Sequence, residues 1–118
     1  MQFSRNCVII EKEIYLREGI AVLRHIVLYR LHDRSEEAKQ ALKNKFLTLQ
    51  GNVPRIRALE AGTDCLFSGR SYDVALVVTF DSLEDLAAYK AHPFHVEVAE
   101  YVHSVAESSV SCDFEAEA

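Results

Sequence analysis

Three side chains suited to acid–base chemistry lie close together in the segment 82–95: Tyr89, His92 and His95, with Pro93 between the two histidines. Proline lacks an amide hydrogen and disfavours helical dihedrals in the residue before it, so one helix should end just before Pro93 and a second should begin there. The bend can aim the phenol of Tyr89 and the imidazole of His95 into one space, which a straight helix would not do. Such a pair can remove a proton beside a carbonyl and hold the enolate oxygen.

The same residues also have a structural interpretation, which the sequence leaves open. His92 can cap the second helix, His95 can hydrogen-bond a neighbouring loop, and Tyr89 can pack with its hydroxyl at the rim, because buried tyrosines and histidines usually have structural partners. If His95 acts as a base, its place in the first turn of the second helix helps, since the positive end of a helix disfavours the imidazolium and lowers the pKa of the ring.

The composition argues against several classes of function. The chain has 118 residues, enough for one packed domain, and a formal net charge of −5 without a basic run, so nucleic acid and anionic membranes are not expected partners. No apolar stretch approaches the roughly 20 residues of a membrane helix, and we expect neither a span nor export. Cys7, Cys65 and Cys112 are widely spaced, which predicts neither a disulfide framework nor a zinc site and favours a reducing cytoplasm.

Hydrophobic periodicity predicts the elements that position the candidate residues. Residues 1–20 differ in character from the rest and form an N-terminal extension, either an edge strand or a short helix. The domain covers residues 21–118. Its expected elements are a strand over 22–31, a helix that starts near Glu36 and is ended by Gly51 and Pro54, a short strand over 56–62, a long strand over 72–80, a helix over 82–91, a helix from Pro93, and a last strand that includes 110–114.

This order predicts an α+β, ferredoxin-like fold: a four-stranded antiparallel sheet with helices on one face. The first and third strands are apolar on both faces, so the face without helices needs a cover. A second copy placed sheet to sheet would supply it, which predicts a homodimer in the form of a dimeric α+β barrel, with an enclosed chamber between the copies near the histidine–proline corner. The alternative cover is the extension of residues 1–20.

Several spaced motifs carry a family resemblance: His25-Ile-Val-Leu-Tyr-Arg-Leu31, Gly62 through Arg70-Ser-Tyr-Asp73, Phe80-Asp-Ser-Leu-Glu-Asp-Leu86, Tyr89, His92-Pro-Phe-His95 and Val110-x-x-Asp-Phe114. From about Leu23 to Glu115 the chain resembles the stress-responsive dimeric α+β barrel (Dabb) domain family. The resemblance implies a ferredoxin-like protomer and a tight homodimer, often without an assigned activity. It also places the chain near a wider group of dimeric barrels that includes small cofactorless monooxygenases.

One branch of this family, the plant polyketide cyclases, is enzymatic, and the resemblance implies that its catalytic tyrosine and histidine correspond to Tyr89 and His95. That branch has paired aromatic residues on the first helix lining an acyl pocket, whereas this chain has Leu42 and Lys43 there. His25 matches a family histidine and could face the pocket next to His95. A lone histidine on an apolar strand can equally be a satisfied core residue.

Two further sets of site residues are expected. His25, Tyr29 and His92 are candidates for binding a small ligand. Some relatives bind a cation through main-chain carbonyls at the end of the first helix, which implies Mg²⁺ or another hard cation at Gln50, Val53 and Ile56, and orphan carbonyls suit such an ion. No other cofactor is expected, because no histidine pair at i, i+4 with a nearby carboxylate indicates a side-chain metal site.

Two functions therefore remain open. The first is a cytoplasmic, homodimeric stress-responsive protein that binds a small apolar or aromatic molecule in its barrel, with no assigned reaction. The second is a cofactor-independent enzyme, cyclase-like or monooxygenase-like, with His95 as general base and Tyr89 stabilising the enolate. A continuous cavity onto which both side chains converge would favour the enzyme, and a dead-end or absent cavity would favour the binding protein.

Overall fold

The computed structural model describes residues 21–117, which form a four-stranded antiparallel sheet with three helices. The elements are β1 (Ala21–Leu31), α2 (Glu36–Leu47), β2 (Ala58–Thr63), β3 (Val74–Phe80), α3 (Leu83–Ala91), α4 (Pro93–Val105) and β4 (Ala106–Glu117). The strand order is β2-β3-β1-β4. The predicted ferredoxin-like fold is confirmed, whereas the expected extension of residues 1–20 lies outside the described part. None of the described helices is long and apolar enough to cross a membrane.

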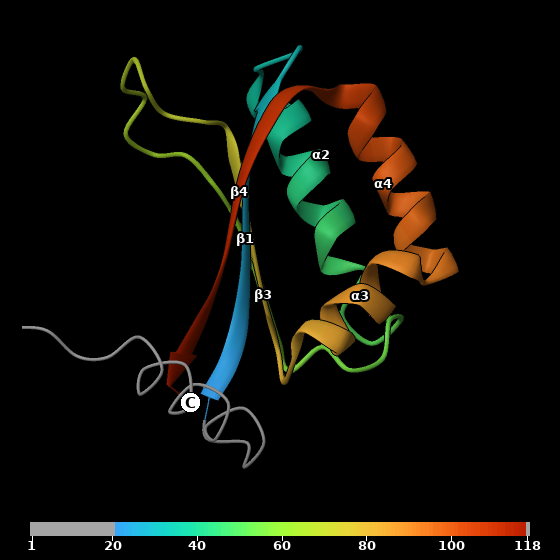
Figure 1. The fold of residues 1–118 in the computed structure, drawn as a ribbon. Coiled ribbons are helices and arrows are strands. Elements are labelled where there is room, and N and C mark those ends of the chain that lie inside the picture. The colour runs from blue at the N-terminus through green and yellow to red at the C-terminus, as the bar shows by residue number, and fades with distance from the viewer. Residues whose placement is uncertain (1–20, 118) are drawn as a thin grey trace, which may run out of the picture.

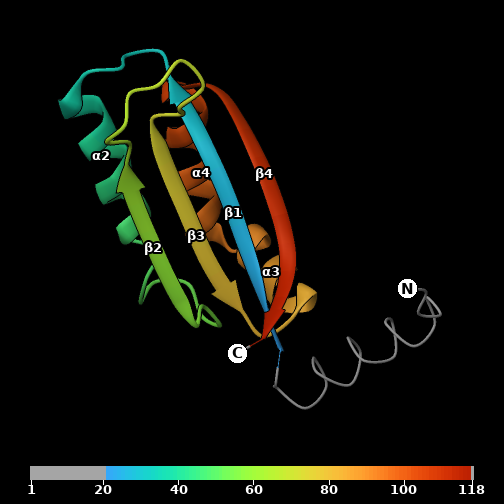
Figure 2. The same cartoon turned by 90° about the vertical axis from the view of Figure 1, so that its left-hand side faces the viewer.

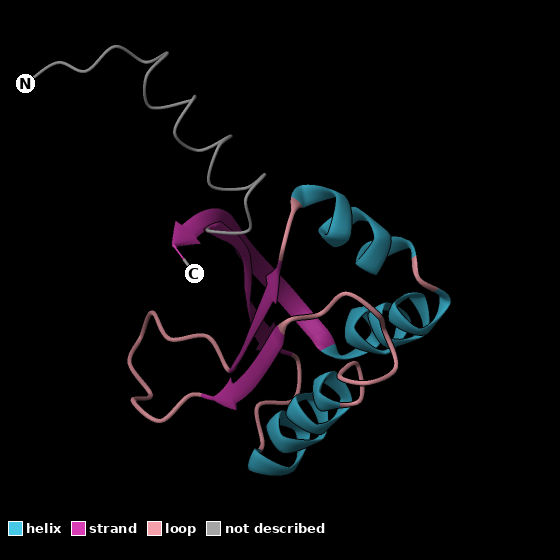
Figure 3. Ribbon diagram, turned by 90° about the horizontal axis from the view of Figure 1, so that it is seen from below, coloured by secondary structure: helices cyan, strands magenta, loops and turns pink. Residues whose placement is uncertain are grey.

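All three helices cover one face of the sheet, as Figures 1 and 3 show. β1 lies between β3 and β4 and sends alternate side chains to this face, where His25, Val27 and Tyr29 are buried. β3 contributes its own alternate residues, from Val74 to Phe80, to the same core. The helix face of β1 is therefore the floor on which the candidate site is built.

The opposite face of the sheet, which we call the bare face, carries no helix (Figure 2). The strand register places apolar residues on it, namely Ile26, Leu28, Ala75, Val77, Val110, Cys112 and Phe114, together with polar ones that include Arg24, Arg30, Glu60 and Thr79. The two largest of these on β4 are open to solvent, Val110 at 46% and Phe114 at 41% exposure. The expectation that the first and third strands are apolar on both faces thus holds only in part, because Arg24 and Arg30 flank Ile26 and Leu28 on this face of β1.

The strand boundaries differ from the predicted ones in a systematic way. The last strand was expected to include 110–114. In the structure β4 extends over 12 residues and also contains Glu115, Ala116 and Glu117. Serine, glutamate and alanine give this segment little strand propensity, and it is extended because it pairs along the whole of β1. The third strand begins at Val74, two residues later than expected.

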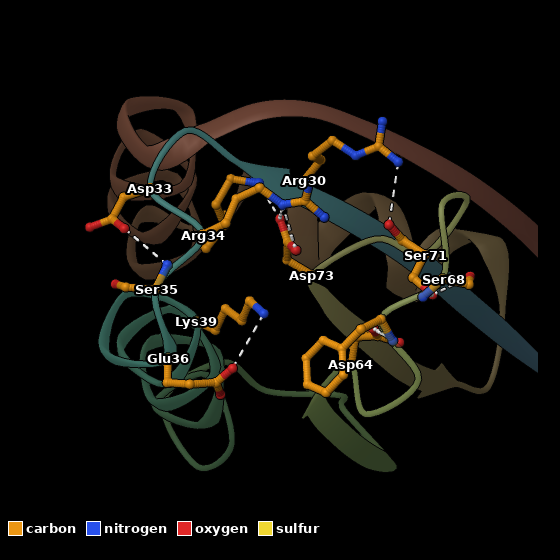
Figure 4. A network of polar contacts seen from close by, with 12 residues as sticks. Arg30, Asp33, Arg34, Ser35, Glu36, Lys39, Asp64, Ser68, Ser71 and Asp73 are labelled. Atoms are coloured by element: carbon orange, nitrogen blue, oxygen red, sulfur yellow. Dashed lines mark hydrogen bonds and ion pairs between the residues drawn. The ribbon is translucent and has the colours of Figure 1, made fainter.

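Asp73 is 1% exposed and joins three segments at one end of the sheet (Figure 4). Its carboxylate accepts hydrogen bonds from the backbone N–H of Leu31 (2.9 Å) and from Nε of Arg34 (3.0 Å and 3.1 Å). Its backbone N–H donates to the carbonyl oxygen of Tyr29 (2.8 Å). A buried carboxylate is tolerated only with such partners, so this network fixes the end of β1, from which Tyr29 reaches the site.

Replacing Asp73 by alanine should lower the free energy of unfolding by about 2 kcal/mol, because the buried N–H of Leu31 loses its acceptor. Asp73→Asn keeps an acceptor for that N–H and should cost clearly less. Urea unfolding measures both variants. A loss below about 0.5 kcal/mol for the alanine variant would show that the network does not stabilise this end of the sheet.

Candidate functional site

Pro93 separates α3 from α4, and the bend lies where the sequence predicts it. The hydroxyl of Ser82 caps α3 by accepting a hydrogen bond from the N–H of Asp85 (3.1 Å). His92 caps α4, because its Nδ1 accepts a hydrogen bond from the N–H of Phe94 (3.1 Å). The structural interpretation of His92 is therefore the one observed. Its imidazole serves as a cap and is not part of the cavity described below, so His92 is not brought to the predicted ligand site.

Tyr89 and His95 come together across the bend. Their ring centroids are 4.3 Å apart at an interplanar angle of 54°. Tyr89 is 1% exposed and also packs against Phe80 of β3, with ring centroids 5.0 Å apart. His95 is half-buried. The predicted convergence of a phenol and an imidazole from either side of Pro93 is thus present.

A cavity of about 570 Å³ lies between the helices and the sheet at this point. Its polar wall includes His25, Tyr29, Tyr89 and His95, and its apolar wall is lined by Val27, Phe46, Leu49, Leu76 and Val98. The chamber expected between two copies is instead on the helix face of the sheet, within one protomer. The expectation was wrong in this respect because His25 and Tyr29 alternate with the residues of the bare face and point away from it.

A hydrogen bond fixes the tautomer of His95. The Nδ1 atom of His95 lies 3.2 Å from the carbonyl oxygen of Lys90. Since a carbonyl oxygen only accepts, Nδ1 carries the hydrogen, and Nε2 is left with a lone pair. Burial lowers the pKa of His95 below its ordinary value of 6.5 and outweighs the hydrogen bond to the Lys90 carbonyl, which acts in the opposite direction. The ring is therefore neutral at pH 7, as the sequence predicts, although burial rather than the end of α4 is the main cause.

The hydroxyl of Tyr89 is buried and has no hydrogen-bond partner among the described residues. Burial raises the pKa of Tyr89 above its ordinary value of 10.0, and the neighbouring Tyr29 adds to the effect. The phenol therefore keeps its proton at neutral pH and can act only as a hydrogen-bond donor or weak acceptor. The expectation that this hydroxyl reaches the rim was wrong, because Tyr89 is enclosed between Phe80 and His95.

His25 faces the cavity and is also held in place by a neighbour. Its Nδ1 lies 2.5 Å from Oδ1 of Asp113, directly opposite on β4. The ring is 6.1 Å from that of Tyr89. Both sequence interpretations of His25 therefore hold, since it lines the site and has a structural partner. Asp113 is the residue that sequence reasoning missed, and the alternation of Asp113 with Phe114 on the last strand was the available signal.

Tyr29 completes the floor of the cavity beside Phe46, with ring centroids 5.0 Å apart. Burial raises the pKa of Tyr29 to about 12, so this phenol also stays protonated. Phe46 is the aromatic residue that α2 supplies to the wall, whereas Leu42 belongs to the core and Lys43 is half-buried outside the cavity. The charged pocket wall expected from Lys43 is therefore absent.

A second hollow of about 460 Å³ adjoins this cavity and shares Lys90, His95, Ala99 and His103 with it. Apart from these four, Val96 and Glu100 of α4 line it. His95 thus lines both the inner cavity and the outer hollow.

The predicted cation ligands lie after α2. Val53 is buried, Ile56 is half-buried and Gln50 is exposed. No described residue donates a hydrogen bond to any of their three carbonyl oxygens. The described residues also contain no cluster of three or more acidic, histidine or cysteine side chains that could hold a metal ion. A main-chain cation site at these positions stays a prediction.

Fold and cavity together define an α+β protein of the ferredoxin-like class with a candidate small-molecule site between its sheet and its helices. The sequence profile of the Stress Responsive A/B Barrel Domain (Dabb) matches residues 23–116, and the chain belongs to this family. No curated protein matches the chain.

Solved structures share the fold. A dimeric ferredoxin-like protein of unknown function from Bacteroides fragilis is 31% identical, over 80% of this chain and 96% of that one, with a TM-score of 0.69. A protein from Arabidopsis thaliana is 25% identical, over 81% and 96%, with a TM-score of 0.71. A hydroxynitrile lyase from Passiflora edulis is 22% identical, over 81% and 94%, also with a TM-score of 0.71.

The imidazole of His95 should titrate with a midpoint below 6.5, followed by NMR of the ring. Because the unfolded chain takes up this proton at higher pH than the folded one, the contribution of neutral His95 to stability is fully present above about pH 6.5 and is lost as pH falls through the folded pKa. His95→Gln should remove this part of the pH dependence of stability. A midpoint at or above 6.5 would contradict the account of a buried, neutral base.

Proposed function

We propose that the protein binds a small, mostly apolar carbonyl compound in the inner cavity and catalyses proton transfer at the carbon beside the carbonyl, without a cofactor. The observation that carries this proposal is the contact between Tyr89 and His95, with ring centroids 4.3 Å apart in the wall of a cavity of about 570 Å³. That volume lies within the range of about 300–1,000 Å³ typical of small-molecule sites. An aldol-type ring closure is one reaction of this kind.

Each residue has a defined role in this step. Nε2 of His95 takes the proton from the carbon, and the electron pair of the broken C–H bond moves into the enolate. The hydroxyl of Tyr89 donates a hydrogen bond to the enolate oxygen and keeps its own proton, because burial raises its pKa. The apolar wall strengthens this hydrogen bond by excluding water. The carbonyl oxygen of a ligand would also supply the partner that the buried hydroxyl lacks.

Acetophenone in D₂O provides a direct test, because removal of a proton beside its carbonyl exchanges that hydrogen for deuterium, which ¹H NMR detects. The protein should accelerate this exchange, and His95→Gln should slow it by about 100-fold, a typical contribution of a general base. His32→Gln, at an exposed histidine outside the cavity, serves as the matched control and should have no effect. Equal rates for the two variants would remove His95 as the base.

Tyr89→Phe separates function from stability. The change removes a buried hydroxyl that has no partner among the described residues, so the free energy of unfolding should stay the same or rise by about 1 kcal/mol. Acetophenone exchange should nevertheless fall by at least about tenfold, because the enolate loses its donor. Urea unfolding and NMR exchange measure the two effects. A clear loss of stability would show that the hydroxyl has a structural role instead.

A second candidate function is binding of such a molecule without turnover. It is favoured by the structural contacts of the site histidines, since His92 caps α4, His25 is bonded to Asp113 and His95 is bonded to Lys90. Saturable binding of small apolar or aromatic ketones, without faster deuterium exchange in any of them, would support this candidate over the first.

Two of the solved structures bear on the proposal. The Passiflora protein is a hydroxynitrile lyase, which indicates that this fold can serve an enzyme. The Bacteroides protein is dimeric, and together with the apolar bare face this supports a homodimer of the present chain. We also place the protein in the cytoplasm, as the exposed free thiols of Cys65 and Cys112 favour a reducing compartment. Sedimentation and fractionation of cells test these two points.

A hard cation at the carbonyls of Gln50, Val53 and Ile56 is a separate proposal, supported by the lack of hydrogen bonds to these oxygens from described residues. Millimolar MgCl₂ should then raise the unfolding temperature more than NaCl of the same ionic strength, since an ion that binds only the folded state stabilises it. Equal unfolding temperatures in the two salts would argue against the site.

A further inference from the structure

The side chains of β4 point alternately to the cavity and to the bare face. One set lines the cavity at Ser109 and Ser111 and holds His25 through Asp113. The residues between them point to the bare face: Val110, Cys112 and Phe114. A displacement of β4 would therefore change the cavity wall and the partner of His25 together.

Within one protomer, β4 pairs with β1 along its length but has few contacts with any other element. β4 is an edge strand that pairs only with β1, and all residues from 107 to 114 are exposed. Its sequence, Ala-Glu-Ser-Ser-Val-Ser-Cys-Asp-Phe-Glu-Ala-Glu, is poor in the β-branched and aromatic residues that favour strands. Edge strands with few buried contacts open first when a protein fluctuates. In an isolated protomer, β4 is therefore held at the site almost entirely by its pairing with β1.

The bare face has the features of a surface that pairs with a copy of itself. Val110 and Phe114 protrude from its β4 side. On the other side, a hollow of about 370 Å³ lies where the β2–β3 loop meets the sheet, lined by Leu28, Gly62 and Ala75 and by polar residues of the loop such as Asp64, Arg70 and Tyr72. In a two-fold dimer the same patch of each copy must fit itself, and a two-fold axis along the strands places β4 of each copy over β2 of the other. Figure 2 shows β2 and β4 at opposite edges.

We infer that a second copy, seated on the bare face, holds β4 against β1 and thereby completes the ligand site on the other side of the sheet. Burial of Val110 and Phe114 in the interface adds to the stability of β4 and so keeps Asp113 against His25. By linkage, a ligand that binds only the completed cavity strengthens the dimer by the same factor. This inference rests on the proposed homodimer and is independent of the reaction.

Phe114→Glu tests the inference, because it places a charge in the interface without touching the cavity. Leu83→Glu is the matched control, since Leu83 is 59% exposed at the start of α3, away from the bare face. Phe114→Glu should sediment as a monomer, and its amides at 109–113 should exchange with deuterium at least about tenfold faster than in the control. The ¹⁵N shift of Nδ1 of His25 should change in the same variant. A monomer with unchanged exchange and an unchanged His25 would overturn the inference.

Dilution of the unaltered protein tests the same inference without a substitution. This test remains valid even if Phe114→Glu does not fold. Exchange of the amides at 109–113 should accelerate over the concentration range in which sedimentation shows the dimer dissociating, while the amides of β3 change much less. Exchange of β4 that is independent of dissociation, or an undiluted protein that is already monomeric with β4 protected, would refute it. Neither readout uses a ligand, so a failure of the proposed reaction is distinguishable from a failure here.

Discussion

Successive side chains of β1 point to opposite faces of the sheet, so this strand contributes to the helix-covered core and to the bare face. Most of the structure follows from this constraint. One set of the β1 side chains, His25, Val27 and Tyr29, needs the helices as cover. The other set, Ile26 and Leu28, lies on a face that the described helices leave open. Because successive residues of a strand point to opposite sides, the two surfaces cannot exchange roles without a shift in register. The site and the proposed partner surface are therefore separated by one layer of backbone.

The break at Pro93 contributes the second requirement of the site. Proline ends one helix and begins the next, and the change of direction places a phenol and an imidazole in contact although they belong to different helices. The carbonyl oxygen of Lys90, near the end of α3, then selects the tautomer of His95. The same local feature thus sets both the position of the candidate base and its protonation, and burial under the helix layer keeps Tyr89 protonated. No metal or cofactor is required for these effects.

Much of the fold and part of the candidate site could be predicted from the sequence, because these features depend on residues that are close together in the chain. The capping by Ser82, the break at Pro93 and the two faces of β1 follow from neighbouring residues alone. What could not be predicted depends on register between distant strands. Asp113 lies beside His25 only because β4 pairs antiparallel to β1, 88 positions away. The role of His92 remained ambiguous, because capping and ligand binding use the same imidazole.

The central claim is that the helix face holds the ligand and the bare face holds a second copy. An isotope-filtered NOE measurement on a mixed sample, half labelled with ¹³C and half unlabelled, tests it most directly. The account predicts contacts between copies from the methyl groups of Ile26, Val77 and Val110, and none from Leu76 or Val98 in the cavity wall. Contacts between copies through the helices, or none from the bare face, would contradict it.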